Sequence, residues 1–377
     1  MNSAIARRPR ILFLIRTLSG AGAELVVESL CRGLDPRRFE CSACEISGHG
    51  EKARDLRSAA YTVHALNADE QQMTLARILW RLRRVVVANR IDLIHTHSTD
   101  ALGLAAMCGW TVPHLRHVHT FHFGNYPNHT PTHLRLERLF HRFTDQLVAV
   151  GRVQASALSR TYGIAENELQ VIWNGVDARP VRIDHERLAP FRKDGRVLIA
   201  TIGTLIPQKG HRDLIAVAVE LKCRGVPARF LIVGGGPLRE ELEGLVRKAG
   251  LQDSVVFLGW IKDSAETILP GVDIVFQPSR WEAMSMVLLE AAIAGKPVVC
   301  TAVGEAREIL RHGETGLLVE PGDEVSMARA LTALVQDPAF RERLGGAAAG
   351  ELRDRCSAAR MVAEYESLYR HVLDAAE

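Results

Sequence analysis

The stretch Arg10-Ile-Leu-Phe-Leu-Ile15 decides the fold class of this chain. It is a short, continuous apolar run, which is typical of a strand buried on both faces of a parallel sheet. A loop containing Gly20 and Gly22 follows this run and precedes a helical stretch. A strand, a glycine-containing turn and a helix in this order indicate the start of a β-α-β unit.

The same alternation of short apolar strands and helical stretches continues along the chain. It is interrupted at Ala178–Gly195, which is rich in Arg, Asp and Pro and lacks a clear period. We therefore expect an α/β protein with two doubly wound parallel sheets, joined by a linker in this segment. The expected strands are Arg10–Ile15, Cys41–Ile46, Tyr61–Leu66, Asp92–His97, Arg116–Phe121, Gln146–Val150, Val197–Ile202, Arg229–Val233, Ser254–Leu258, Asp273–Gln277, Pro297–Cys300 and Gly316–Val319.

The length of 377 residues also suits two domains. We expect Rossmann-like domains at residues 1–178 and 179–355, and a C-terminal helix at 356–377 that packs back toward the first domain. The two domains are expected to face each other across a cleft. Ligands of such sheets bind at the carboxyl ends of the strands, so functional residues should directly follow strands.

The composition excludes several classes of protein. Hydrophobic residues make up 47% and charged residues 24% of the chain, and the net charge is +3. These values are typical of a globular protein and give no basic surplus of the kind that nucleic-acid-binding proteins carry. No apolar run approaches the ~18 residues of a membrane span, and Ile11–Ile15 is too short for a signal-peptide core. The expected location is the cytoplasm.

Seven cysteines are scattered along the chain, and the odd number argues against a disulfide framework. Cys41 and Cys44 form a C-x-x-C pattern inside an expected strand, where residues three apart face opposite sides of the sheet. Core packing is therefore the favoured interpretation of this pair, and a metal or redox site is the alternative.

The strongest chemical signal is a pair of glutamates, Glu282 and Glu290, with seven residues between them. Glu282 lies in the loop after an expected strand, and Glu290 lies in a helix that opens near Ser285. The loop amides and the helix N-terminus make an anion site that suits a pyrophosphate. Glu290 can then accept two ribose hydroxyls and Glu282 can accept sugar hydroxyls. The alternative is two surface glutamates on an amphipathic helix, which the apolar neighbours of Glu290 disfavour.

These motifs resemble those of the retaining glycosyltransferases of family four, which have the GT-B fold, and the resemblance covers nearly the whole chain. The strongest match is the Glu282–Glu290 segment together with the Ala294–Val299 stretch that follows it. Further matches are Ala21–Glu24, Asn174–Asp177, Ile202–Gly210 and His312–Val319.

The resemblance implies a hexosyltransferase-type enzyme that moves a sugar from a nucleotide-diphosphate sugar to a glycan or lipid-linked acceptor with retained configuration. It implies a role in polysaccharide or glycoconjugate synthesis, an acceptor-side first domain, a donor-binding second domain and no cofactor or metal. A non-catalytic nucleotide-sugar or glycan binder and a sugar-nucleotide epimerase stay open as alternatives. A dehydrogenase is disfavoured, because the loop after the first strand lacks a spaced G-x-G-x-x-G fingerprint.

By the same resemblance, Lys209, Glu282 and His122 are the catalytic residues. Lys209 follows an expected strand, where a mobile cation can meet the diphosphate leaving group. The family usually pairs this lysine with an arginine, but Thr204 stands at that position, so one phosphate cation is missing unless Arg280 replaces it. The donor-binding residues that the resemblance implies are Gly22, Thr204, Ile261, Met284, Ser285, Met286 and Glu290.

Several histidines lie in or beside two expected strands. Alternation places His117 and His119 on one face, whereas His122 falls beyond the end of its strand. The resemblance assigns the active-site histidine of the sugar pocket to His122, with His119 as the alternative. His97 and His119 are candidates for the acceptor side, although a buried, hydrogen-bonded histidine is an equally good interpretation of His95 and His97.

The stretch Thr74–Asn89 has an amphipathic pattern that allows two interpretations. It is either a surface helix that contacts an anionic membrane peripherally or a sheet-covering helix with a solvated basic face. The apolar face comprises Leu75, Ile78, Leu79, Leu82 and Val86, and the basic face comprises Arg77, Arg81 and Arg84.

Overall fold

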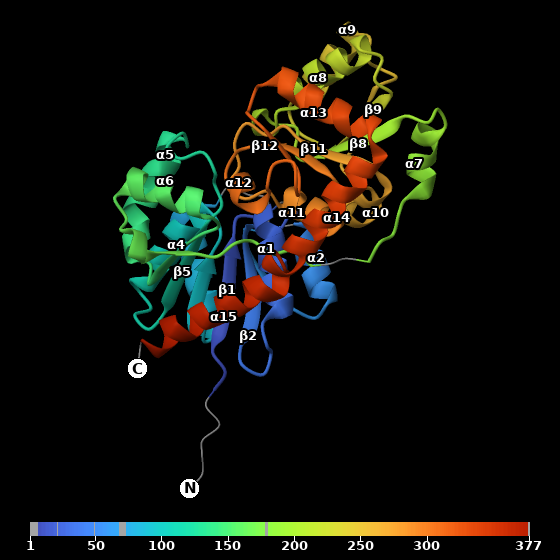
Figure 1. Cartoon of the computed structure of the whole chain (residues 1–377). Coiled ribbons are helices and arrows are strands. Elements are labelled where there is room, and N and C mark those ends of the chain that lie inside the picture. The colour runs from blue at the N-terminus through green and yellow to red at the C-terminus, as the bar shows by residue number, and fades with distance from the viewer. Residues whose placement is uncertain (1–6, 21, 49, 68–72, 178–179, 376–377) are drawn as a thin grey trace. The chain divides into compact units, whose positions relative to one another are not determined.

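The structure, a computed structural model, describes residues 7–20, 22–48, 50–67, 73–177 and 180–375. Ala21 and two residues of the expected linker, 178 and 179, therefore lie outside the described residues. The chain divides into two compact units: Met1–Gly175 together with Ala358–Glu377, and Val176–Ser357. Each unit has its own sheet (Figure 1).

The first unit contains a seven-stranded parallel sheet with the order β3-β2-β1-β4-β5-β6-β7. The order reverses between β1 and β4, and loops at the carboxyl ends of strands form a binding crevice at such a point. The strands are β1 (Arg10–Ile15), β2 (Glu40–Ser47), β3 (Thr62–Asn67), β4 (Leu93–Thr96), β5 (Arg116–Phe121), β6 (Gln146–Ala149) and β7 (Leu169–Val171). The helices are α1 (Gly22–Gly33), α2 (Glu51–Ser58), α3 (Leu75–Ala88), α4 (Thr99–Gly109), α5 (Pro131–Phe140), α6 (Arg152–Tyr162) and α15 (Ala358–Asp374).

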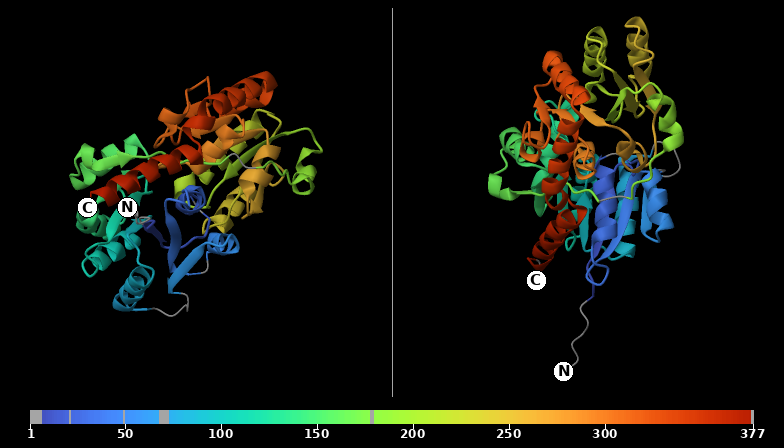
Figure 2. Two further views of the ribbon diagram at one scale, coloured as in Figure 1. Left: turned by 90° about the horizontal axis from the view of Figure 1, so that it is seen from below. Right: turned by 45° about the vertical axis from the view of Figure 1, so that its right-hand side comes forward.

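The last helix, α15, belongs to the core of the first unit although it is far from it in sequence. Its side chains Met361, Tyr365 and Tyr369 are fully buried among residues of β1, β2 and α1. Figures 1 and 2 show the red helix α15 lying along the blue strands of this unit. The first unit is therefore completed by the end of the chain.

The second unit contains a six-stranded parallel sheet with the order β10-β9-β8-β11-β12-β13. Its core cluster joins the sheet to the helices α8, α9 and α13. The strands are β8 (Val197–Ile202), β9 (Ala228–Val233), β10 (Val255–Gly259), β11 (Ile274–Gln277), β12 (Val298–Thr301) and β13 (Leu317–Val319). The helices are α7 (His185–Arg192), α8 (His211–Cys223), α9 (Arg239–Lys248), α10 (Ser264–Thr267), α11 (Met286–Ile293), α12 (Ala306–Ile309), α13 (Glu324–Gln336) and α14 (Pro338–Arg355).

The predicted pair of doubly wound parallel sheets is confirmed, and every expected strand is present within one residue at each end. Two elements were missed. The strand β7 has only three residues, too few to show a hydrophobic pattern. The helix α7 lies inside the expected linker, where Asp184 caps it by accepting a hydrogen bond from the backbone N–H of Arg187 at 3.0 Å. It buries Leu188 alone, so its sequence carries no helical period.

The two cysteines of the C-x-x-C pattern face opposite sides of the first sheet, as predicted. Cys44 is buried in the core cluster under α3 and α4, whereas Cys41 packs against the cluster under α1 and α15. Burial raises the pKa of the Cys41 thiol to about 12. Both thiols are therefore protonated and serve as packing groups.

The amphipathic helix is present as α3, with two corrections. Arg81, which was expected on the basic face, is half-buried and donates to the carbonyl of Leu66 at 2.7 Å. Leu82 and Val86 are buried, but Leu75, which was expected on the same face, is 57% exposed. Leu75 is the first residue of the helix, so it lies beyond the part of α3 that covers the sheet. In the part of the chain that the structure describes, no helix combines the length and apolar character that crossing a membrane requires.

Candidate active site

The first group of predicted site residues comes together in two loops of the second unit. Lys209 ends a short 3-10 turn after β8, and Glu282 lies in the loop between β11 and α11. The ammonium Nζ of Lys209 lies 2.6 Å from the Oε1 of Glu282. The Lys209 side chain is only 20% exposed, so it is not a freely solvated loop lysine.

The carboxylate of Glu282 is held by two further donors. The hydroxyl of Ser279 donates to Oε1 at 2.8 Å, and the amide of Gln208 donates to Oε2 at 3.1 Å. Three donors from two different loops therefore fix the direction of one carboxylate. We call this group, comprising Gln208, Lys209, Ser279 and Glu282, the donor-loop cluster.

The two loops approach each other so closely that only a glycine fits between them. Gly210 has a φ of +66°, and a Cβ at this position would lie 1.8 Å from the carbonyl oxygen of Pro278. The backbone N–H of Arg280 also donates to the carbonyl of Gln208 at 2.7 Å. The backbone geometry thus keeps Lys209 beside Glu282.

The helix α11 begins directly after the donor-loop cluster. The hydroxyl of Ser285 caps it by accepting a hydrogen bond from the N–H of Leu288 at 3.4 Å. The side chains of Met284 and Met286 are 7% and 8% exposed, so they pack inside the second unit rather than extend into solvent. Glu290 lies in the second turn and is half-buried.

Thr204 and Arg280 are the two residues that concern the absent arginine. Thr204 is exposed, and its carbonyl accepts a hydrogen bond from Ile206 at 2.9 Å. Arg280 forms an ion pair with Asp213, whose side chain is 2% exposed. The Arg280 guanidinium is therefore already paired with a buried carboxylate, and it joins the β11–α11 loop to α8.

Ile261 follows β10 and is half-buried, next to Trp260, which is 59% exposed.

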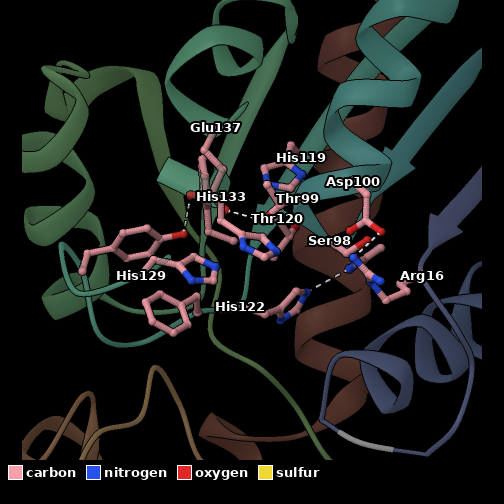
Figure 3. A pocket seen from close by; sticks show the side chains of 14 residues that line it. Arg16, Ser98, Thr99, Asp100, His119, Thr120, His122, His129, His133 and Glu137 are labelled. Carbon is pink, nitrogen blue, oxygen red and sulfur yellow. Dashed lines mark hydrogen bonds and ion pairs between the residues drawn. The ribbon is translucent and has the colours of Figure 1, made fainter. Parts of the chain in front are cut away.

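The second group of predicted residues lines a cavity of about 200 Å³ in the first unit (Figure 3). The cavity opens at the carboxyl ends of β1, β4 and β5, the side of the sheet where ligands are expected. Figure 3 shows Arg16 and Asp100 pointing toward each other, and they form an ion pair at 2.8 Å. The residues that line it are Arg16, His97, Ser98, Thr99, Asp100, His119, Thr120, Phe121, His122, Phe123, Tyr126, His129, His133 and Glu137.

His97 and His122 form a pair in the wall of this cavity. The Nδ1 of His97 lies 3.0 Å from the Nε2 of His122, and the rings are stacked. Burial lowers the pKa of His122 to about 4 and holds the pKa of His97 well below its ordinary value. Both rings are therefore neutral at pH 7, so each carries one donor and one acceptor nitrogen. Among the described residues, the Nε2 of His97 has no hydrogen-bond partner.

His117 and His119 share one face of β5, as predicted, because both contact the Thr96 hydroxyl. The distances from Thr96 Oγ1 are 2.9 Å to His117 Nε2 and 2.8 Å to His119 Nδ1. His119 lines the cavity, whereas His117 is outside its lining. His97 and His119 both line the cavity, which fits their interpretation as candidates for the acceptor side.

His95 has the other role that its sequence position allowed. Its Nδ1 lies 2.7 Å from the Tyr369 hydroxyl, and its Nε2 lies 2.8 Å from the Thr120 hydroxyl. Thr120 also contacts the Tyr365 hydroxyl at 2.9 Å. His95 is fully buried, and its hydrogen bonds tie α15 to the sheet.

Sequence reasoning missed the buried acid of this cavity, Glu137. It is 2% exposed and accepts hydrogen bonds from the hydroxyls of Thr99, Tyr126 and Tyr162 at 2.6, 2.8 and 2.6 Å. These donors lie in three other segments of the chain, so no local spacing connects them. The glutamate of α5 by itself looks like an ordinary surface residue.

A stack of three rings, also missed, forms another wall. The ring of His129 lies 3.8 Å from that of Phe123 and 4.3 Å from that of His133, nearly parallel to both. Stacked planar rings suit a polyhydroxylated ligand, which presents apolar C–H faces.

Gly22 begins α1 after the loop that follows β1. The buried carboxylate of Glu45 holds this loop by accepting hydrogen bonds from the backbone N–H groups of Leu18 at 2.8 Å and Gly50 at 3.0 Å.

Over the ranges that the structure describes, no group of three or more His, Cys, Asp or Glu side chains is arranged to hold a metal ion.

Two doubly wound parallel sheets, each with predicted site residues at the carboxyl ends of its strands, fit the GT-B glycosyltransferases that the sequence resembles. A family model described as "Glycosyltransferase Family 4" matches residues 20–179, and one described as "Glycosyl transferases group 1" matches residues 183–350. The chain belongs to this family, the group 1 glycosyltransferases of family four. The hexosyltransferase-type enzyme class predicted from the sequence is confirmed.

Individual relatives match along most of the chain. The 2-deoxystreptamine N-acetyl-D-glucosaminyltransferase of Streptomyces fradiae is 29% identical over 371 residues, 93% of this chain and 87% of that protein. The lipopolysaccharide core biosynthesis glycosyltransferase LpsD of Rhizobium meliloti is 28% identical over 354 residues, 92% of this chain and 94% of that protein. Anabaena HepE, solved with UDP and glucose, has a TM-score of 0.84 at 21% identity, covering 97% of this chain and 100% of that structure.

Proposed function

We propose that this enzyme transfers a hexose-type sugar from a nucleotide-diphosphate sugar to a glycan or lipid-linked acceptor, with retained anomeric configuration. The observation that carries the proposal is the donor-loop cluster, which places Lys209 and Glu282 directly before the N-terminus of α11. A cation, a fixed carboxylate and the N-terminus of a helix together suit a sugar diphosphate.

The donor-loop cluster also explains how the site can receive the donor. In the free protein Lys209 neutralises Glu282. A diphosphate is the stronger partner for a mobile ammonium, so Lys209 turns toward it when the donor binds. Ser279 and Gln208 keep the Glu282 carboxylate in place, and its freed lone pairs accept sugar hydroxyls.

The remaining donor residues keep the roles that the resemblance implies. Glu290 accepts the ribose hydroxyls, and the backbone near Ile261 contacts the base. The backbone N–H groups of residues 284–286 bind the diphosphate, and Gly22 and His122 contact the donor phosphate and sugar. No cofactor or metal takes part, because Lys209 and the helix dipole supply the positive charge that the leaving group needs.

The bond changes follow from these roles. The bond between the anomeric carbon and the diphosphate oxygen breaks, and its electron pair leaves with the diphosphate. The acceptor hydroxyl forms the new bond on the same face of the sugar, and its proton passes to a diphosphate oxygen. Stabilisation of charge on the leaving group is the largest catalytic contribution.

The acceptor is proposed to bind in the histidine-lined cavity of the first unit. His97, His119 and the Arg16–Asp100 pair offer hydrogen bonds, and the Phe123–His129 stack offers an apolar face. The relatives' names include an aminocyclitol and a lipopolysaccharide core as acceptors. A hydroxyl-rich ring in a polysaccharide or glycoconjugate is the acceptor class that this cavity suits, and the cytoplasm, where nucleotide sugars are made, is the proposed location.

A thermal-shift screen against UDP-, GDP- and ADP-sugars tests the donor site. A ligand that binds only the native state raises the Tm, so one nucleotide class should do so for the wild type and less for Lys209→Ala. Lys248→Ala, an exposed lysine at the end of α9, is the matched control. NMR of the product then gives the configuration of the new bond, and an inverted product would contradict retention.

The two alternatives give different results when the donor found in the screen is incubated with the enzyme and the products are analysed. A non-catalytic binder would bind the donor without any transfer or hydrolysis, and Lys209→Ala would bind it as well as the wild type. An epimerase would change the donor sugar without needing an acceptor. Because Thr204 carries no charge and Arg280 is paired with Asp213, the non-catalytic binder is the alternative most worth excluding.

A further inference from the structure

The outward face of α3 is unusual for a helix that covers a sheet. Trp80 is 54% exposed and Val87 is 50% exposed, although both are large apolar residues. At helical spacing they share one face with the exposed arginines Arg77, Arg83 and Arg84. We call these five residues the Trp80 face.

The charge on this helix is entirely positive. Residues 73–90 contain five arginines and no aspartate or glutamate. Arg81 is directed inward and donates to the carbonyl of Leu66 at 2.7 Å, which leaves the outer arginines for a partner. The guanidinium of Arg84 lies 4.8 Å from the centre of the Trp80 ring, so charge and aromatic surface are presented together.

A second exposed aromatic pair joins the end of α4 to the short 3-10 helix His141–Phe143. Trp110 follows α4 and is 59% exposed, and its ring meets that of Phe143 edge-on at 5.4 Å, with Phe143 46% exposed. The helices α3 and α4 share one core cluster, so they are neighbours. The same neighbourhood places Arg83 of α3 near Cys108 of α4. Burial raises the pKa of the Cys108 thiol to about 11, and the Arg83 guanidinium opposes this rise.

The positive charge extends across this part of the chain. Residues 73–143 contain nine arginines and three carboxylates, a surplus of six in a protein whose net charge is +3. The rest of the chain is therefore net acidic. Such a separation orients a molecule toward an anionic surface.

We propose that the Trp80 face docks the enzyme on a bilayer that carries anionic lipid headgroups. Arginines bind the headgroup phosphates, while Trp80 and Val87 enter the interfacial layer, where amphipathic aromatic rings are favoured. The exposed apolar side chains favour a bilayer over a nucleic acid or a soluble polyanion, because neither of these offers an apolar layer. This docking is independent of which sugar or acceptor the enzyme uses.

Vesicle flotation with the full-length protein tests the proposal. At low salt the wild type should float with vesicles of phosphatidylcholine and phosphatidylglycerol, but not with phosphatidylcholine alone. The double variant Arg77→Glu/Arg83→Glu should weaken partitioning by at least about tenfold, since each arginine near an anionic surface contributes roughly a fivefold factor. Raising the salt should weaken wild-type binding, because the Debye length shrinks.

Two variants separate the contributions. Trp80→Ser keeps every charge but removes the inserting ring, so it should also weaken binding and abolish most of the blue shift of tryptophan fluorescence with vesicles. Arg247→Glu/Lys248→Glu on α9 makes the same change of charge in the other unit and should leave partitioning unchanged. All these side chains are exposed, so circular dichroism and Tm should match the wild type.

Three results would overturn the proposal. The first is a wild type that stays unbound with anionic vesicles. The second is a control variant that loses as much binding as the α3 variant. The third is tight binding to heparin or nucleic acid without any binding to vesicles, which would make the Trp80 face a polyanion site instead.

Discussion

The donor-loop cluster and the histidine cavity differ in the charge state of the side chains that build them. In the second unit, a lysine and a glutamate form an ion pair within two adjacent loops. In the first unit, His97 and His122 are neutral rings, and the buried acid Glu137 is surrounded by hydroxyl donors. The cavity also contains the Arg16–Asp100 ion pair, so the contrast is between a lysine–glutamate pair beside a helix N-terminus, which suits a diphosphate, and a largely neutral set of donors and acceptors, which suits hydroxyls. We propose on this basis that the two sites serve the donor and the acceptor.

The largest expected effect comes from removing the only lysine of the donor-loop cluster. Lys209→Ala should lower kcat/KM by about 10²–10³, the loss typical of one group that stabilises developing charge. The free energy of unfolding should fall by only about 1 kcal/mol, since Glu282 keeps its two other hydrogen bonds. Steady-state kinetics and urea unfolding measure the two quantities. A variant with unchanged kcat/KM would remove Lys209 from the catalytic group.

The second prediction tests whether a cation at position 204 improves binding of the donor. Thr204→Arg should tighten donor binding if the diphosphate lacks a partner at this exposed position, and leave it unchanged if Lys209 and the α11 N-terminus already suffice. Calorimetry with the nucleotide identified in the screen measures the change. A variant that binds the donor more weakly than the wild type would show that position 204 does not face the phosphates.

The next effect concerns the ribose. Glu290→Gln should weaken nucleotide binding by about tenfold, because a charged acceptor of hydroxyl hydrogen bonds is worth about 1.5–3 kcal/mol and the amide oxygen retains part of it. Isothermal calorimetry with the nucleotide alone measures the loss. Glu308→Gln, on an exposed turn of the same unit, is a matched control, and equal affinities for all three proteins would exclude Glu290 from the site.

The neutral histidines of the first unit should make the free energy of unfolding depend on pH under acidic conditions. Burial lowers the pKa of His117 to about 4, so between about pH 6.5 and 4 the unfolded chain binds a proton that the folded chain does not. Stability should therefore fall as the pH falls through this window, by up to about 1.4 kcal/mol per pH unit for this group, and be constant above it. His117→Gln should reduce the slope, and the exposed His114→Gln should leave it unchanged.

The smallest expected effect is that of removing divalent metal ions, which should leave the activity unchanged. Activity should survive EDTA, because the positive charge at the leaving group comes from Lys209 and the α11 N-terminus. Loss of turnover with EDTA that Mn²⁺ or Mg²⁺ restores would contradict this mechanism.

The sequence predicted the donor-loop cluster better than the cavity, for a physical reason. Lys209, Glu282 and Ser285 follow strands with a readable hydrophobic pattern, and their neighbours along the chain position them. The cavity is built by side chains that are far apart in the sequence, and the partners of Glu137 are a threonine and two tyrosines outside its own helix. Alternation along β5 predicted that His117 and His119 share a face, but nothing local predicted that His97 would meet His122.

The position of α15 has a consequence for how the protein is made. The first 175 residues are synthesised long before Tyr365 and Tyr369, which fill the core of the first unit. The Tyr369 hydroxyl is hydrogen-bonded to His95, and the Tyr365 hydroxyl is hydrogen-bonded to Thr120. The unit that is synthesised first therefore completes its core last, after the whole second unit has emerged. Until then, the buried His95 and Thr120 side chains lack their tyrosine partners, so the nascent chain carries an incomplete core while the second unit is synthesised.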